Sequence, residues 1–393
     1  MAERLAIIGA SGFVGSALTE YAADHAGLDV MPFCHSTGGA SRLAHRGMSI
    51  RQLDLMDRAA VDTALSGVDY VVNCSRGGDR LMLSGLENLL HACSKGSVKK
   101  LVHLSSVAVY GDPPPASSTN EDAPTEPAPR SYGATKLAQD RLVQRAASKG
   151  LPSVILCPPN IIGPYSDYLT DIIQSIETGR FRYIDGGHRC INVVDVNNLS
   201  ACMINALRSE IIDGRRLFAC EPADVNWLDL TMELEPVLRD HPAIPSISSE
   251  MFVDGGAAPG PSPLRKQGLA SALKHLASDE VRTALRGNPM WASMEKTAKG
   301  GVRLMGKGVE DRLRDTFAGP IKVAVARPEE MIDRPLIAQQ LRGVKHDPGR
   351  CHRELGFTPP LTFAESMQSF RNWYIEHFDF GSSEWAMLGK ASR

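Results

Sequence analysis

Residues 5–15 read Leu5-Ala6-Ile7-Ile8-Gly9-Ala10-Ser11-Gly12-Phe13-Val14-Gly15, and this stretch decides the fold of the chain. The apolar residues 5–8 predict a buried parallel strand, and the pattern after the glycines predicts a helix. We expect Gly9 to allow a tight turn, Gly12 to let the backbone approach a pyrophosphate, and Gly15 to pack the helix closely on the strand. A glycine-rich turn without a ligand is the plainer interpretation of three glycines, but the flanking strand and helix favour a phosphate site.

The next apolar stretch, residues 31–36, ends without the acidic residue that usually binds the ribose hydroxyls of NAD. His35, Ser36 and Arg42 stand there instead, and these side chains are able to contact a 2′-phosphate. The sequence therefore favours NADP over NAD. A neutral surface histidine is the plainer interpretation of His35.

Short apolar strands alternate with helical patterns through the first half of the chain. Strands are expected at residues 69–73, 100–104 and 153–157, with a further short strand at 191–195 that leads to a helix. This alternation predicts an α/β fold built on a doubly wound parallel sheet. A proline-rich loop, residues 111–129, separates the fifth strand from the next helix.

The chain is expected to form two parts. Residues 1–163 would bind the dinucleotide, with residues 190–220 returning to that part, and residues 164–189 and 221–393 would form a smaller substrate-binding part. From about residue 254 to 319 the composition changes to clustered glycine and proline, followed by a helical pattern with one apolar face made of Leu264, Leu269, Leu273 and Leu276. A solvated helical insertion is the plainer interpretation of this segment, and a surface that contacts a partner or a membrane is the alternative.

The composition is that of an ordinary globular protein. With 393 residues, of which 43% are hydrophobic, the chain is long enough to bury one large core or two adjoining ones. The net charge of -2 argues against a nucleic-acid surface. The 8 cysteines include no Cys-x-x-Cys pair, which suits buried thiols in a reducing cytoplasm, and no metal site is expected. The first strand begins at once and no apolar run could span a membrane, so we expect a cytoplasmic protein without a signal peptide or transmembrane segment.

Two short segments predict proton chemistry. In Tyr132-Gly133-Ala134-Thr135-Lys136, an ammonium lies one helical turn from a phenol. Such a lysine is expected to lower the pKa of Tyr132, so that the tyrosine could exchange a proton with a substrate hydroxyl near neutral pH. Ser105 and Ser106 follow the strand at 100–104, at the edge where open α/β sheets bind ligands. A serine there can hydrogen-bond a reacting oxygen, although it could also merely cap the strand end.

These motifs together resemble the extended short-chain dehydrogenase/reductase family, in its NAD-dependent epimerase/dehydratase branch. The resemblance rests on the glycine motif, on residues 105–111 and on Tyr-x-x-x-Lys, and it covers nearly the whole chain. It implies a Rossmann-type sheet, a catalytic role for Ser106, an acid/base role for Tyr132, and a Lys136 that holds the nicotinamide ribose. Family members often pair through helices around Tyr-x-x-x-Lys, so a homodimer is expected.

The resemblance also implies contacts further along the chain. Asp54 and Leu55 resemble an Asp-Leu pair that meets the adenine, and residues 158–161 resemble a segment whose proline region touches the nicotinamide and whose asparagine meets the substrate. Residues 347–357 resemble a signature near the family's C-terminus. The candidate cofactor contacts are Gly9, Ser11, Gly12, Phe13, Val14, Gly15, His35, Ser36, Arg42, Asp54, Leu55, Lys136 and Pro158, and the candidate substrate contacts are Ser105, Ser106, Tyr132, Asn160 and His188. Asp54 and Asn160 could also be turn residues that satisfy their own backbone.

Departures from the family pattern narrow the chemistry. Val107 and Ala108 stand where dehydratases carry acidic residues, which argues against dehydration. Met82 and Cys157 stand where the family often has Asn and Arg. His188 stands where sugar-nucleotide epimerases often have Arg, and a neutral imidazole is expected to bind a diphosphate more weakly than a guanidinium does.

Three functions follow from these observations. The first is an NAD(P)-dependent epimerase of a nucleotide sugar, and the second is an NADPH-dependent reductase or dehydrogenase of a ketone, aldehyde or secondary alcohol. The third is a non-catalytic dinucleotide-binding module, against which the presence of both Tyr132 and Lys136 argues. No motif names the substrate.

Overall fold

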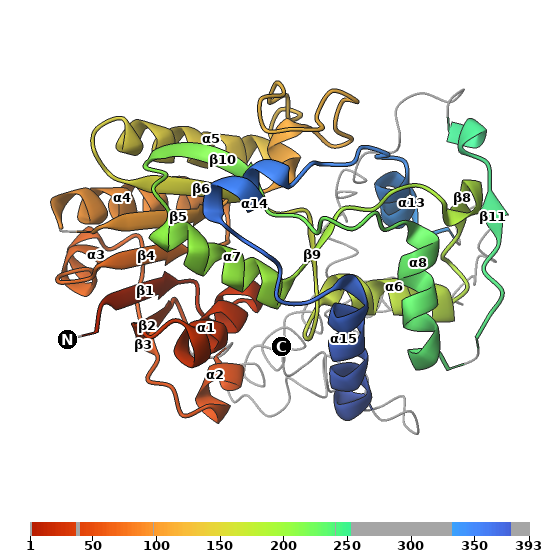
Figure 1. Cartoon of the computed structure of the whole chain (residues 1–393), viewed down its shortest axis with the longest axis horizontal. Coiled ribbons are helices and arrows are strands. Elements are labelled where there is room, and N and C mark those ends of the chain that lie inside the picture. Colours follow the sequence, from red (N-terminus) through yellow and green to blue (C-terminus); the bar gives the residue numbers. More distant parts are fainter. Residues whose placement is uncertain (1, 37–39, 97, 240, 253–331, 379–393) are drawn as a thin grey trace, which may run out of the picture. The chain divides into compact units, whose positions relative to one another are not determined.

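The computed structural model describes residues 2–36, 40–96, 98–239, 241–252 and 332–378 (Figure 1). The predicted insertion at about 254–319, with its alternative role as a partner or membrane surface, lies outside these residues.

A seven-stranded parallel sheet forms the larger lobe, and it confirms the predicted fold class. Its strand order is β10-β6-β5-β4-β1-β2-β3. The strands are β1 (Arg4–Ile8), β2 (Asp29–Cys34), β3 (Arg51–Gln52), β4 (Tyr70–Asn73), β5 (Lys100–Leu104), β6 (Ser153–Cys157) and β10 (Asp213–Phe218). The order reverses at β1, which pairs with β2 on one side and β4 on the other. A crevice outside the carboxyl ends of the strands is expected at such a reversal.

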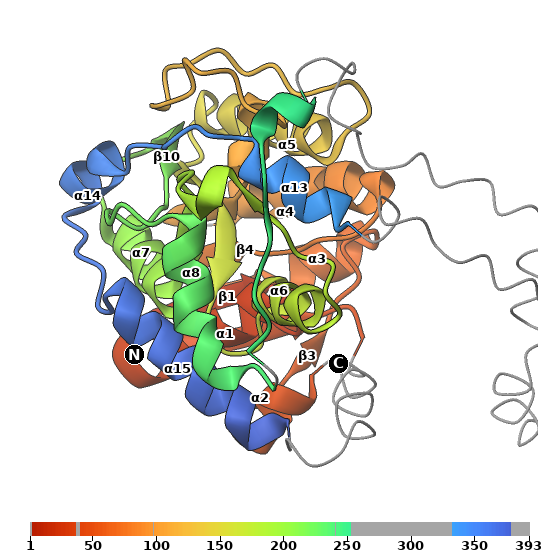
Figure 2. The same cartoon turned by 90° about the vertical axis from the view of Figure 1, so that its right-hand side faces the viewer.

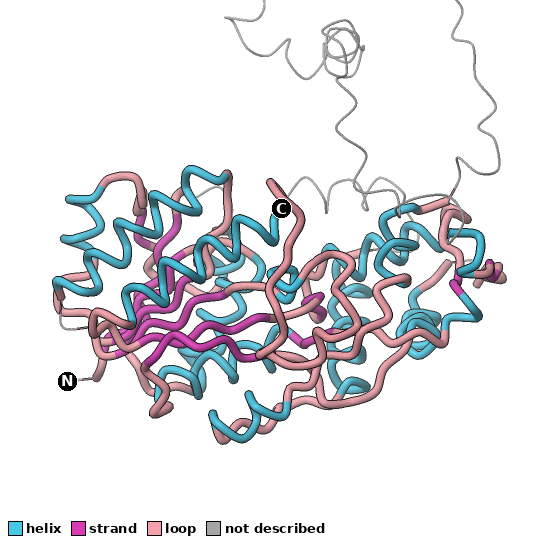
Figure 3. The backbone as a smooth tube through the Cα atoms, turned by 90° about the horizontal axis from the view of Figure 1, so that it is seen from above, coloured by secondary structure: helices cyan, strands magenta, loops and turns pink. Residues whose placement is uncertain are grey.

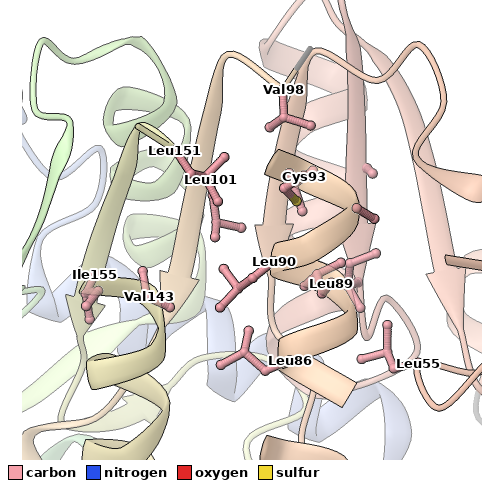
Figure 4. Packing of buried hydrophobic residues seen from close by; sticks show 14 of the residues in the cluster. Leu55, Leu86, Leu89, Leu90, Cys93, Val98, Leu101, Val143, Leu151 and Ile155 are labelled. Atoms are coloured by element: carbon pink, nitrogen blue, oxygen red, sulfur yellow. The ribbon is translucent and has the colours of Figure 1, made fainter. Parts of the chain in front are cut away.

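Helices cover both faces of this sheet, as the tube drawing shows (Figure 3). They are α1 (Phe13–His25), α2 (Ser41–His45), α3 (Arg58–Ala64), α4 (Leu86–Lys95), α5 (Tyr132–Ala147) and α7 (Val196–Arg208), with single turns at η2 (Leu81–Gly85) and η3 (Val107–Tyr110). One face packs the leucines of α4 and Val143 of α5 against strand residues such as Leu101 and Ile155 (Figure 4). The other face packs α1 and α7 in a second core cluster. Burial on both faces explains why the central strands are continuous apolar runs.

A smaller lobe has its own core. Its short strands pair two by two, β7 (Asn160–Ile162) with β9 (Val193–Asp195) and β8 (Tyr183–Ile184) with β11 (Ser246–Ile247). Its helices are α6 (Asp167–Glu177), α8 (Trp227–Leu234), α13 (Arg334–Gln340) and α15 (Phe363–His377), with single turns at η4 (Asp185–Gly187), η5 (Glu235–Val237) and η6 (Ser249–Phe252). Figure 2 shows α8 beside α15, where Trp227 and Phe370 belong to one buried aromatic cluster.

One helix departs from the predicted division into two parts. The sequence predicts that residues 221–393 belong to the smaller part, but Cys351 and Leu355 of α14 (Gly349–Leu355) pack with α7 in the core of the larger lobe. The chain therefore returns to the larger lobe before α15 completes the smaller one. The division itself stays a prediction.

Two further observations concern the described residues. None of their helices is both long enough and apolar enough to cross a lipid bilayer. Within the same ranges, no cluster of His, Cys, Asp and Glu side chains has the makeup of a metal site.

Candidate functional site

The glycines after β1 are required by the backbone geometry. Gly9 has φ +84°, in the left-handed region, and a Cβ there would lie 2.9 Å from the Cα of Ser75. A Cβ on Gly15 would lie 2.1 Å from the carbonyl oxygen of Gly9. The turn and the close packing of α1 on β1 are therefore as predicted, and neither position accepts a larger residue without a backbone shift.

The start of α1 suits a diphosphate. Gly12 caps the helix without a side chain that could satisfy the amide groups of the first turn, and these amides have no partner inside a helix. Gly12, Phe13, Val14 and Gly15 line a cavity of about 520 Å³. A helix N-terminus with free amides and no competing side chain fits the phosphates of a dinucleotide. Ser11 precedes this segment and is not among the residues that line the cavity.

Ser106 and Tyr132 each begin a helical turn at the cavity. Ser106 starts η3, where its hydroxyl accepts a hydrogen bond of 3.2 Å from the amide of Ala108. Tyr132 is the first residue of α5, which Ser131 caps. A Cβ on Gly133 would lie 2.1 Å from the carbonyl oxygen of Ala108, so only glycine lets α5 approach η3 this closely.

Lys136 joins α5 to the sheet. Its ammonium donates a hydrogen bond of 2.9 Å to the carbonyl oxygen of Leu104, the last residue of β5. The side chain is buried, and burial lowers its pKa to about 8, while the nearby carboxylate of Asp140 opposes that shift. Lys136 is thus held in one place beside the cavity.

The cavity brings together most of the catalytic and substrate candidates. Besides the glycine loop, it is lined by Ser105, Ser106, Tyr132, Lys136, Pro158 and Asn160. These residues come from the segment after β5, from α5 and from the segment after β6, all at the carboxyl edge of the sheet. Val107 and Ala108 also line it, so no acidic side chain stands at those two positions beside the catalytic candidates.

The predicted effect of Lys136 on Tyr132 is wrong for this structure. Burial raises the pKa of Tyr132, and the charge of Arg76, not that of Lys136, opposes the rise. Tyr132 is 43% exposed, because it faces the open cavity, but the walls of that cavity still limit the water around it. Desolvation of the phenolate therefore outweighs the nearby positive charge.

The residues predicted for a 2′-phosphate do not gather at the cavity. His35 and Ser36 are exposed after β2, and neither lines the cavity. The guanidinium of Arg42 donates to both carboxylate oxygens of Glu20 and lies 4.2 Å from the ring centre of Tyr165. The placement of Arg42 therefore gives no support to the predicted phosphate contact, because its side chain binds Glu20 of α1 and lies against Tyr165 of the smaller lobe.

Three further candidates also lie away from the cavity lining. Asp54 accepts a hydrogen bond of 2.9 Å from the amide of Met56, as a turn residue does, and Leu55 is buried in the core. His188 is exposed and lies over Gly186. These placements match the plainer interpretation of Asp54 and leave His188 off the cavity wall.

Sequence reasoning missed several residues that line the cavity. Arg76 follows β4, and the position of that loop at the carboxyl edge of the sheet was a usable signal. Asp112 and Arg342 form an ion pair at 2.8 Å, and they are 230 residues apart. His346 binds the carbonyl oxygen of Ser118 at 2.7 Å. No local pattern marks these last contacts.

Comparison with known proteins gives the same family as the motifs. The model of the NAD dependent epimerase/dehydratase family matches residues 5–215, which is more than half of the chain. A ketoreductase of a farnesyl-dihydroquinoline oxide from Stigmatella aurantiaca is 28% identical over 52% of this chain and 64% of its own length. An N-acetylglucosaminyl-diphospho-undecaprenol 4-epimerase from Escherichia coli O157:H7 is 26% identical over 61% of this chain and 73% of its own. The chain thus spans less than two thirds of the ketoreductase.

Solved structures share the fold. A nucleoside-diphosphate-sugar epimerase from Pseudomonas aeruginosa superposes with a TM-score of 0.61 at 18% identity, covering 97% of this chain and 99% of that one. A UDP-glucuronic acid 4-epimerase from Bacillus cereus, in complex with UDP-glucuronic acid and NAD, gives 0.61 at 14% identity, covering 95% and 100%. Fold, motifs and family model agree, and the chain belongs to the NAD-dependent epimerase/dehydratase family, within the extended short-chain dehydrogenases/reductases.

Proposed function

We propose that the protein is an NAD(P)-dependent epimerase that acts on a nucleotide sugar. The observation that carries this proposal is a single cavity lined both by the glycine loop and by Ser106, Tyr132 and Lys136. The relatives and neighbours of the chain include epimerases of UDP-sugars, and one epimerase of a sugar linked to undecaprenyl diphosphate. A dinucleotide on the glycine loop and the carbinol carbon of a sugar would therefore lie in one cavity, beside the phenol of Tyr132.

Tyr132 and Ser106 carry out the proton transfer in this proposal. Tyr132 takes the proton of a sugar hydroxyl, and the hydroxyl of Ser106 hydrogen-bonds the same oxygen. When bound, a nicotinamide would supply the hydride acceptor and donor, and the ketone would have to turn over within the cavity to receive the hydride on its other face. Tyr132 then gives the proton back to the new alkoxide. Since Val107 and Ala108 carry no acid, the ketone is not dehydrated.

NAD comes first in this proposal and NADP second, which reverses the order favoured by the sequence. Arg42 was the strongest cation predicted for a 2′-phosphate, and Glu20 engages it. His35 and Ser36 are exposed and stay available for that phosphate. Asp54, Leu55 and His188 keep their predicted contacts only as proposals, since none of them lines the cavity.

The experiment uses the purified full chain and a panel of UDP-sugars. We expect NAD to be released when the protein is denatured, and one sugar to be converted to its 4-epimer, as followed by proton NMR. A Tyr132→Phe variant should keep its nucleotide and lose the conversion. Steady consumption of added NADPH, with no epimer formed, would contradict the epimerase.

A net reductase of a ketone, aldehyde or secondary alcohol is the second candidate. One observation favours it: the smaller-lobe wall, as far as it is described, offers no unpaired cation for a diphosphate. Arg342 pairs with Asp112 there, and His188 lies off the wall. The similarity to the Stigmatella ketoreductase points the same way. A protein that is purified without nucleotide and binds NADPH would favour this function.

A non-catalytic dinucleotide-binding module is the third candidate, and a wild-type protein that retains nucleotide but turns over neither sugars nor carbonyl compounds would favour it. Unchanged turnover in Tyr132→Phe would instead contradict the acid/base role of Tyr132. The homodimer, the cytoplasmic location and the two-part division of the chain are also proposals. Light scattering on the full chain tests the homodimer, and cell fractionation tests the location.

A further inference from the structure

Arg76 places a positive charge against the face of Tyr132. Its guanidinium carbon lies 5.3 Å from the centre of the tyrosine ring. Both residues line the same cavity. Across the ranges that the structure describes, no Asp or Glu forms an ion pair with Arg76, and its charge is not neutralised by a neighbour there.

The loop that carries Arg76 is held at both ends. At one end, the amide and the hydroxyl of Ser75 donate to the side-chain oxygen of Asn73, at 3.1 and 2.7 Å. At the other end, Asp79 accepts a hydrogen bond of 2.9 Å from the hydroxyl of Thr135. Thr135 lies on α5, the helix that begins with Tyr132. The loop is therefore fastened to the same helix as the tyrosine, which fixes where Arg76 can reach.

Lys136 is less well placed to act on the phenol. Its ammonium lies 6.0 Å from the centre of the Tyr132 ring and donates a hydrogen bond to the carbonyl oxygen of Leu104. Two other titratable groups act electrostatically on the tyrosine, Asp140 on α5 and Cys157 at the end of β6. Both raise the pKa of Tyr132, and Arg76 lowers it. Arg76 is therefore the cation that opposes the rise in the pKa of Tyr132 caused by burial.

We propose that Arg76 is a positioning residue for Tyr132. The guanidinium of Arg76 stabilises the phenolate of Tyr132 while the tyrosine exchanges a proton with the substrate. This inference rests on the proposed function, since it takes Tyr132 as the acid/base. It assigns to Arg76 an effect that the Tyr-x-x-x-Lys spacing alone assigns to Lys136. The motif then describes only part of the electrostatics of the site.

The test reads the ionisation of one tyrosine without any turnover. Tyr132 is replaced by 3,5-difluorotyrosine, which ionises before alkaline unfolding begins, in the full chain with the same NAD concentration in every sample. The fluorine NMR shift then gives the ionisation midpoint. Arg76→Gln should raise this midpoint by about one pH unit, since a unit charge about 5 Å from the ring centre in a partly hydrated site has an effect of that order. Arg76→Lys should keep most of the original midpoint, because it keeps the charge.

Arg80→Gln is the matched control, since Arg80 is an exposed arginine just after the same loop. We expect it to leave the midpoint unchanged. An Arg76→Gln midpoint equal to that of the wild type would overturn the inference, and so would equal shifts in all three arginine variants. Because the readout needs no substrate, either result would leave the epimerase proposal standing. Conversely, a missing epimer product would not change the measured midpoint.

Discussion

The two ends of the cavity are specified in different ways. At the glycine loop, the backbone itself leaves no choice of residue, since a Cβ on Gly15 would lie 2.1 Å from Gly9. On the smaller-lobe wall, the side chains are held by partners far away in sequence, such as Arg342 by Asp112, 230 residues apart. The comparison teaches that the cofactor end is encoded by local sequence and the substrate end by long-range contacts. Retained nucleotide and substrate kinetics, measured in the same variants, test whether the two ends are separate.

The largest effect is expected where the two ends meet. Tyr132→Phe removes the proton donor and acceptor and should lower kcat/KM on the identified substrate by about 10²- to 10⁴-fold. Retention of nucleotide, measured after denaturation, should not change. Tyr21→Phe, on the opposite face of the sheet in α1, is the control and should leave kcat/KM unchanged. Loss of the nucleotide in Tyr132→Phe would mean that the two ends are not independent.

The pH dependence of stability sharpens the account of Lys136. The pKa of this lysine falls to about 8 in the folded protein, so between about pH 8 and its unfolded value near 10.4 the unfolded chain binds more protons. The unfolding free energy should therefore rise with pH in this window, by up to about 3 kcal/mol from this group.

This rise is measured as the difference between the wild type and Lys136→Met in urea unfolding at each pH. The stability of the wild type relative to Lys136→Met should be lowest below pH 8 and should rise toward pH 10.4. A difference that does not vary with pH would show that Lys136 is not desolvated. The lost hydrogen bond to Leu104 adds a constant to the difference and does not affect its slope.

At the cofactor end, Gly15→Ala should lower both stability and nucleotide retention. The added methyl group meets the backbone of Gly9 and Ala10, which cannot rotate away. The unfolding free energy should fall by about 1–3 kcal/mol, as for other overpacked sites. Gly78→Ala is the control, because a Cβ there meets nothing within 4 Å. Equal losses in both variants would contradict the crowding argument.

The smallest effect is expected on the smaller-lobe wall. Arg342→Met breaks a partly exposed ion pair with Asp112, and such pairs contribute at most about 1 kcal/mol. KM for the substrate should rise by up to about fivefold, while nucleotide retention stays as in the wild type. Asp112→Asn should act in the same direction. A drop in retained nucleotide in Arg342→Met would contradict the view that the cofactor end and the substrate end of the cavity are separate.

Most of the fold could be predicted from the sequence. The alternating strands and the glycine loop predict the parallel sheet, because each depends on residues close together in the chain. Ser106, Tyr132 and Lys136 were found for the same reason, and they line one cavity. The pKa of Tyr132 could not be predicted, because it depends on burial and on Arg76, which the spacing of the motif does not contain.

The sequence by itself determined the dinucleotide-type sheet, the turn that only glycine can make, and the order of serine, tyrosine and lysine at the carboxyl edge. The turn follows from steric limits between neighbouring residues, and the order of the three side chains follows from the strand and the helix that their own segments form. Only the tertiary structure decided that Glu20 engages Arg42, that Arg76 faces Tyr132, and that Arg342 pairs with Asp112. Such contacts join distant segments, and the strength of a charge depends on the burial that the packed chain creates around it.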